Sequence, residues 1–271
     1  SIFMEIIVKL KVLLMMLVVC PLAMATTLES IIEGAQRSAK HLARDDSRHP
    51  LQTFQFFEVE PNHTVVEISP GGSGWYTEIL APLLRDLGKL YAAHYDPDAE
   101  YEYFKNSLKA YQTKLAASPE VYDKVELTIM QPPSKIEIGP DGSADRVLTF
   151  RNVHNWVKNG GADEAMAAFY KVLKPGGILG VVDHRAKAGT SIEQMNRSGY
   201  VTEKLTVDLA DAAGFKLIAK SEINANAKDS TEHEKGVWTL PPSLRLGEQD
   251  RERYQAIGES DRMTLKFAKP E

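Results

Sequence analysis

Short apolar runs alternate with amphipathic segments along most of the chain. The runs predict strands at 64–68, 89–94, 124–130, 146–150, 178–182, 215–219 and 263–268. Apolar residues at helical spacing predict helices at 28–44, 76–83, 98–117, 163–173 and 201–213. Strands that alternate with helices, several of them apolar throughout, indicate a mostly parallel sheet with helices on both faces. The pattern therefore predicts an α/β fold.

Two flanking regions differ from this repeating pattern. Residues 26–58 precede the first strand and predict an N-terminal helical cap. Residues 222–260 are polar and irregular, apart from Trp238-Thr-Leu-Pro-Pro242, and predict an insertion before the last strand. No repeat or linker interrupts the region between them. We therefore expect a single domain over residues 26–271.

The N-terminal segment has the features of a secretion signal. Lys9 and Lys11 precede an uncharged, largely apolar stretch from Val12 to Leu28, which contains Ala23-Met24-Ala25. Small residues two positions apart are typical of a signal-peptidase site, and a spanning helix needs about 20 apolar residues. We predict a signal peptide over residues 1–25 that is cut after Ala25, which leaves a periplasmic or secreted protein without a stable membrane anchor. The alternative is an anchor that is never cut.

Composition narrows the classes of function. The 271 residues include 32 Lys and Arg against 37 Asp and Glu, a formal net charge of −5. Binding of duplex nucleic acid needs a dense basic face, so we expect no nucleic-acid partner. The one cysteine, Cys20, lies inside the predicted signal. The mature chain would then have neither a thiolate nucleophile nor a cysteine metal ligand. Nothing in the sequence indicates the oligomeric state.

A glycine-rich turn, Ser69-Pro-Gly-Gly-Ser-Gly74, follows the first predicted strand. Such turns let the backbone approach a ligand and expose N–H groups at the start of the next helix. A dinucleotide fingerprint is incomplete because Thr77 stands where the third glycine is expected. A phosphate-binding loop would need a lysine, and a nucleophile elbow would need glycine at Trp75. Tight strand–helix packing is the structural alternative.

These residues resemble the first motif of class I S-adenosylmethionine-dependent methyltransferases, in which an acidic residue such as Glu67 ends the first strand before a Pro-Gly-x-Gly-type turn. The segment LKPGG at 173–177 and the final strand also resemble that family. More closely, FRNVHNW, VDHRA, GVWTLPPSL and GESDRMTL resemble an exported group of bacterial methyltransferase-like proteins. The resemblance implies a Rossmann-like sheet whose last strand is antiparallel. It also implies S-adenosylmethionine as cofactor and a small-molecule methyl acceptor.

The resemblance assigns cofactor contacts residue by residue. Glu67 would lie near the amino-acid end of the cofactor, above a turn that contributes Ser69, Gly71, Gly72 and Gly74. Family members usually end the second strand with an acidic residue that holds the ribose. Here His94 occupies that place, and Asp96 follows two positions later. Gln131 is the available residue at the adenine position, and Arg151 and Asn152 complete the expected cofactor site.

Candidate catalytic residues follow the fourth and fifth main strands. Methyl transfer requires alignment of the acceptor, exclusion of water and, for some acceptors, removal of a proton. Asn152 and His154 are expected to face the methyl group, and His154 or His184 is the candidate base. The alternative for His154 is a hydrogen-bonded side chain that only shapes the pocket. Arg151 could bind an acidic substrate or form an ion pair that fixes its loop.

A metal site has weak support. His94 and Asp96 could join Asp183 or His184 around a divalent ion, but this spacing is unspecific and we predict no metal. We expect in-line methyl transfer to a small molecule. The alternative is a non-catalytic periplasmic small-molecule-binding protein on the same fold, favoured by His94 at the ribose position and by the cytoplasmic origin of the cofactor. A nicotinamide oxidoreductase is disfavoured by Thr77.

Overall fold

The computed structural model describes residues 27–271, so the predicted signal peptide lies outside the described residues. Within this range, no helix combines the length and the apolar character needed to cross a bilayer.

A mixed, mostly parallel sheet forms the centre of the molecule. Its strands are β1 (Thr64–Ile68), β2 (Lys89–His94), β3 (Val125–Gln131), β4 (Lys135–Glu137), β5 (Ala144–Phe150), β6 (Leu173–Ala186), β7 (Val201–Thr202), β8 (Lys216–Ser221) and β9 (Arg262–Ala268). Their order is β4-β3-β2-β1-β5-β6-β9-β8, and β7 pairs with the end of β6. β9 inserts antiparallel between β6 and β8. The predicted fold class, including an antiparallel last strand, is confirmed.

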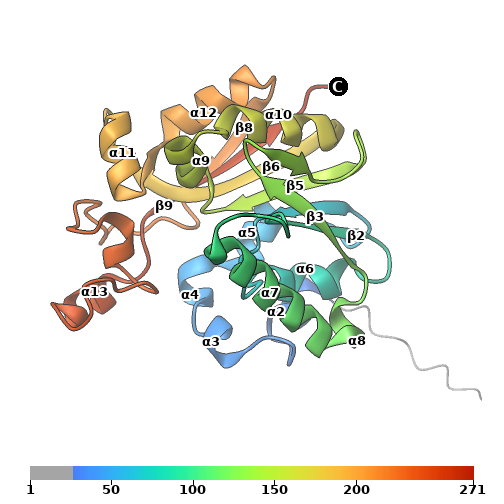
Figure 1. The fold of residues 1–271 in the computed structure, drawn as a ribbon, viewed down its shortest axis with the longest axis horizontal. Coiled ribbons are helices and arrows are strands. Elements are labelled where there is room, and N and C mark those ends of the chain that lie inside the picture. The colour runs from blue at the N-terminus through green and yellow to red at the C-terminus, as the bar shows by residue number, and fades with distance from the viewer. Residues whose placement is uncertain (1–26) are drawn as a thin grey trace, which may run out of the picture.

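Helices cover both faces of this sheet (Figure 1). They are α2 (Leu28–Ile32), α3 (Ala39–Leu42), α4 (Asp45–Arg48), α5 (Pro50–Phe56), α6 (Thr77–Leu84), α7 (Glu102–Ala117), α8 (Pro119–Tyr122), α9 (Val153–Asn159), α10 (Ala162–Val172), α11 (Ile192–Ser198), α12 (Glu203–Ala212) and α13 (Arg251–Ile257), with a 3₁₀ turn at Gly236–Thr239. In Figure 1, α10 and α12 lie on one side of the sheet and α6 and α7 on the other.

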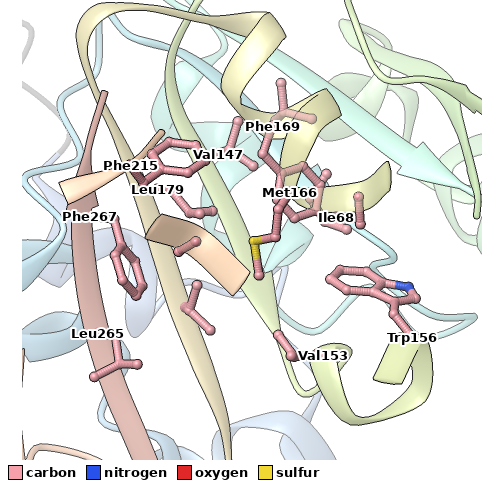
Figure 2. Packing of buried hydrophobic residues seen from close by; sticks show 14 of the residues in the cluster. Ile68, Val147, Val153, Trp156, Met166, Phe169, Leu179, Phe215, Leu265 and Phe267 are labelled. Carbon is pink, nitrogen blue, oxygen red and sulfur yellow. The ribbon is translucent and has the colours of Figure 1, made fainter. Parts of the chain in front are cut away.

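Each face buries its own apolar cluster. On the first face, Met166 and Phe169 of α10 pack on Val147 and Leu179 of the central strands, as Figure 2 shows. On the second face, α2, α5 with the residue that follows it, and α6 contribute Ile31, Phe54, Phe57, Ile79 and Leu80. Apolar burial on both faces explains why the central strands read as uninterrupted hydrophobic runs.

The predicted helix at 28–44 is wrong, because the segment contains two short helices, α2 and α3. The Gln36 side chain donates hydrogen bonds to the carbonyl oxygens of Ile31 (2.7 Å) and, across the structure, of Glu78 (3.2 Å). Ser38 then caps α3 by accepting from His41 N. Polar contacts with α6 therefore take the place of continuous helical hydrogen bonds.

Several other elements of the structure were not predicted. Residues 153–159, for which no helix was predicted, form α9, which begins at the site described below. β6 begins at Leu173, before the strand predicted at 178–182, and pairs irregularly with β5 there. The short elements α8, β4, α11 and β7 were not predicted.

The contact between the N-terminal cap and the sheet gives a stability prediction. A Cβ atom at Gly180 would lie 2.8 Å from Leu148 Cδ2 and 2.8 Å from the buried Phe57 ring. Gly180→Val should therefore lower the free energy of unfolding by about 1–3 kcal/mol through overpacking. Urea denaturation measures the change. Phe57→Leu makes room for the new side chain, so the double variant should lose less than the sum of the single changes. Unchanged stability of Gly180→Val would contradict this packing.

Candidate functional site

A cavity of about 1120 Å³ lies beyond the carboxyl ends of β1, β5 and β6. Parallel α/β sheets place their ligand sites at this edge. The segments 69–75, 94–97, 151–156 and 183–186 each contribute lining residues. The N-terminal cap and the 222–260 insertion complete the wall, through Arg48 and Trp238 among others.

Some residues of the glycine turn line this cavity, and others pack against α7. Ser69 and Gly71 line it, and both have positive φ angles, 49° and 69°. A Cβ atom at Gly71 would meet no atom within 4 Å. Gly72 and Gly74 face the other way, because their Cβ positions lie 3.1 Å from Ala110 and 2.8 Å from Tyr111 of α7. Ser69 and Gly71 therefore present the backbone to a ligand, whereas Gly72 and Gly74 allow α7 to pack closely.

Glu67 lies at the floor of the cavity and is almost fully buried. Its Oε2 accepts a hydrogen bond from Thr77 Oγ1 (2.6 Å), which lies 3.0 Å from the Tyr111 hydroxyl. Burial raises the pKa of the Glu67 carboxyl to about 7, although the bond from Thr77 opposes the shift. Arg151 and Lys114 also favour the ionised form, but burial dominates, so an ionised Glu67 is costly unless a further cation lies close to it.

The structure places His94 and Asp96 outside the residues that line the cavity. His94 is completely buried, its ring 5.1 Å from the Tyr111 ring, and its Nδ1 accepts from Tyr95 N (2.8 Å). Burial lowers the pKa of His94 to about 4, so the ring is neutral at pH 7. Asp96 pairs with Lys135 (3.4 Å). The His94 ring turns inward toward α7, so Tyr95 and Gln131, just after β2 and at the end of β3, line the cavity instead.

The segment after β5 turns sharply into α9. Arg151 has a φ of 64°, and its N–H donates to Val182 O (2.7 Å). The Asn152 side chain donates to Ile68 O (3.1 Å) and Thr149 Oγ1 (3.2 Å), tying this turn to the end of β1. Arg151 and Asn152 both line the cavity.

His154 and Asp183 form a buried hydrogen-bonded pair. His154 Nδ1 lies 3.0 Å from Asp183 Oδ1, and His154 N donates to Asp183 Oδ2 (3.2 Å). Asp183 is fully buried at the end of β6, whereas His154 lines the cavity. With a proton on Nδ1 held by the carboxylate, Nε2 of His154 is free to accept another. This is the arrangement of an oriented general base.

His184 lies beside this pair, its ring 5.1 Å from that of His154. Its Nδ1 is 2.5 Å from Ser260 Oγ, and its backbone N–H donates to Asp183 Oδ1 (2.7 Å). Burial, together with His154 and nearby arginines, lowers the pKa of His184 well below its usual value. The neutral His184 side chain contributes a polar, uncharged surface to the cavity.

The same three side chains have the geometry of a possible metal site. His154, Asp183 and His184 each offer one ligand atom, and these atoms lie within 4.8 Å of one another. Both Asp183 oxygens already accept N–H hydrogen bonds, which accounts for the arrangement without an ion. His94 and Asp96, the other residues considered for a metal, belong to a different part of the structure.

Sequence reasoning missed two features of the site. Asp183 was considered only as a metal ligand, not as the partner of His154. Arg48, Glu259 and Arg262 also line the cavity, and Arg48 Nε donates to Glu259 Oε2 (3.4 Å). The GESDRMTL segment contains two of these residues, but its proximity to Arg48 depends on the folded chain.

Solved structures with a similar fold include several methyltransferases. The S-adenosylmethionine-dependent methyltransferase from Aquifex aeolicus has a TM-score of 0.56 and 13% identity, over 90% of this chain and 98% of that protein. The [4+2]-cyclase SpnF has a TM-score of 0.56 and 16% identity, over 88% and 85%. The S-adenosylmethionine-dependent methyltransferase SibL in its apo form has a TM-score of 0.52 and 12% identity, over 86% and 57%.

The chain has a class I methyltransferase fold. Identities this low establish the fold and leave the reaction open. No protein-family model matches the sequence, and the search of curated proteins found no match. The evidence for function in this methyltransferase fold therefore comes from its own site.

The raised pKa of Glu67 predicts a particular pH dependence of stability. An unfolded glutamate ionises near pH 4.5, whereas Glu67 keeps its proton to about pH 7 in the folded chain. The folded state binds more protons in this window, so this carboxyl contributes stability below pH 4.5 that is lost as the pH rises to 7. Glu67→Gln should therefore gain on the order of 3 kcal/mol relative to wild type between pH 4.5 and 8. Urea denaturation at both pH values measures it.

The exposed residue Glu100 provides the matched control, and Glu100→Gln should follow the wild-type curve. If Glu67→Gln also followed that curve, the carboxyl would not be desolvated as the structure indicates.

Proposed function

We propose that the chain is an S-adenosylmethionine-dependent methyltransferase that acts on a small molecule in the periplasm or outside the cell. One observation carries the reaction: the His154–Asp183 pair and the Glu67–glycine turn reach the same cavity. The location rests on the N-terminal sequence alone, with its basic start, apolar stretch and Ala23-Met24-Ala25 motif.

The residues around the glycine turn suit this cofactor. Gly71 leaves open space where any other residue would place a side chain. Glu67 is a buried carboxylate whose ionised form needs a neighbouring positive charge, such as the ammonium or sulfonium group of S-adenosylmethionine. Tyr95 and Gln131 offer an aromatic ring and an amide on the same side. When bound, the cofactor supplies an electrophilic methyl group.

His154 performs the acid–base step in this proposal. Its Nε2 accepts the proton that the acceptor's oxygen or nitrogen loses on methylation, and Asp183 stabilises the imidazolium that forms. Asn152 fixes the turn before α9 through its bonds to Ile68 and Thr149, so the position of His154 depends on it. Trp238 lies with its ring 6.3 Å from that of His154 and helps to exclude water.

A non-catalytic binding protein is the second candidate. The observation that favours it is the end of β2, where the buried, neutral His94 stands in place of an acid that faces the cavity. The cyclase SpnF further illustrates that a similar fold supports another reaction. Formation of S-adenosylhomocysteine distinguishes the two candidates, because only an enzyme releases it.

The test measures S-adenosylhomocysteine formed from S-adenosylmethionine with a panel of small hydroxy, amino and carboxylic acceptors. Wild type should convert at least one acceptor, and His154→Ala should reduce kcat by about 10²–10⁴-fold, because it removes the base. Affinity for S-adenosylhomocysteine should stay within about threefold, since His154 acts on the proton and not on cofactor binding.

His233 provides a matched control because it also pairs with an aspartate, Asp229 (2.7 Å), and does not line the cavity. His233→Gln should retain wild-type turnover, and EDTA should leave turnover unchanged. Normal turnover in His154→Ala would refute the base. Binding of S-adenosylhomocysteine without turnover of any acceptor would favour the binding protein.

A further inference from the structure

The cavity carries a charge opposite to that of the whole chain. Its lining contains five arginines and two glutamates, with neither lysine nor aspartate, although the chain has a net charge of −5. The charged lining residues are Arg44, Arg48, Arg151, Arg245, Arg262, Glu67 and Glu259. A cavity with low-dielectric walls focuses such a field and attracts an anion.

Three of these arginines share one carboxylate. Glu259 accepts from Arg44 Nε (2.6 Å), Arg48 Nε (3.4 Å) and Arg262 Nη2. Burial opposes ionisation of Glu259, but Arg262, Arg48 and Arg44 hold its pKa well below its usual value. Two positive charges of this cluster therefore remain without a matching carboxylate.

The cluster also has unpaired donors. Arg44 Nη2, Arg48 Nη1 and Arg262 Nε are buried and have no hydrogen-bond partner within residues 27–271. The Arg48 side chain is only 3% exposed. Leaving a charged donor buried and unpaired is costly, so an oxyanion that reached these donors would lower that cost.

Arg151, in the turn between β5 and α9, is another arginine that lines the cavity. It forms no ion pair within the described part of the chain, and its Nη1 donates to the Tyr76 hydroxyl (3.5 Å). Its guanidinium carbon lies 5.7 Å from the centre of the Tyr76 ring, and that of Arg48 lies 5.8 Å from the same ring. The left-handed backbone of Arg151, at a φ of 64°, is a strained conformation of the kind that clusters at binding sites. Tyr76 thus brings two cationic groups together.

We propose that Arg48 and Arg151 bind the acid group of the methyl acceptor, which is a small organic anion. Guanidinium groups match carboxylate and phosphate oxygens through paired N–H donors. Tyr76, Phe150 and Trp238 offer aromatic surfaces in the same cavity to the apolar part of the acceptor. The anion site stands on the arginines, and its role in methyl transfer rests on the proposed function.

The experiment titrates the protein with three probes of similar size: 4-hydroxybenzoate, phenyl phosphate and the neutral 4-hydroxybenzamide. Calorimetry at low salt, without cofactor, should show an acid binding at least about tenfold more tightly than the amide. The tighter of the two acids identifies the acid group. Arg151→Gln should weaken that acid by at least about tenfold and leave the amide unchanged.

Arg151 is only partly buried and forms no ion pair within residues 27–271, so its replacement keeps the fold, and Arg48→Gln should give the same loss. Arg197→Gln, at an exposed position of α11, is the control and should bind like wild type. Equal affinity of acids and amide, unchanged affinity in Arg151→Gln, or no binding of either acid would overturn the proposal. A separate titration with S-adenosylhomocysteine distinguishes failure of the anion site from failure of the methyltransferase function.

Discussion

The functional edge of the sheet depends on one buried carboxylate, that of Asp183. A charge buried at the end of β6 is tolerated only when hydrogen bonds replace its water. Asp183 accepts from the His154 ring, from His154 N and from His184 N. These bonds fix the start of α9 and the direction of both histidines. His184 extends the network through Ser260 to the segment before β9. The hydrogen bonds around the buried Asp183 carboxylate therefore connect the end of β6, the start of α9 and the segment before β9.

Acidic and basic side chains both line the cavity. Glu67 lies at the glycine turn, where its burial favours a cation. Arg48 and Arg151 lie toward the N-terminal cap and the loop after β5, where they favour an anion. A cationic methyl donor beside Glu67 and an anionic acceptor beside the arginines would each lower the desolvation penalty of the group that they contact. The cap and the insertion supply Arg48 and Glu259 to the cavity, which the central sheet does not contain.

Local patterns predicted the sheet well, and long-range contacts explain the failures. β1 and β2 match their predicted bounds, because a strand that is buried on both faces has a continuous run of apolar residues. The break between α2 and α3 depends on Gln36 reaching Glu78, which no local pattern contains. His94 stands at the expected position, but its side chain turns toward α7 because Tyr111 packs against it. Within the site, His154 could be recognised from its loop, whereas its pairing with Asp183 depends on strand order.

The most direct test of the central claim is calorimetric titration of residues 26–271 with S-adenosylhomocysteine, with NADH as the comparison ligand. The account predicts one binding site of micromolar affinity for S-adenosylhomocysteine and none for NADH, because Glu67 and Gly71 present a cation-binding floor without a phosphate-binding loop. The Gly71→Val variant should lose this binding, since its side chain would occupy the open space above the turn. A folded wild-type protein that binds no S-adenosylhomocysteine would contradict the account and leave the methyltransferase fold as evidence of ancestry alone.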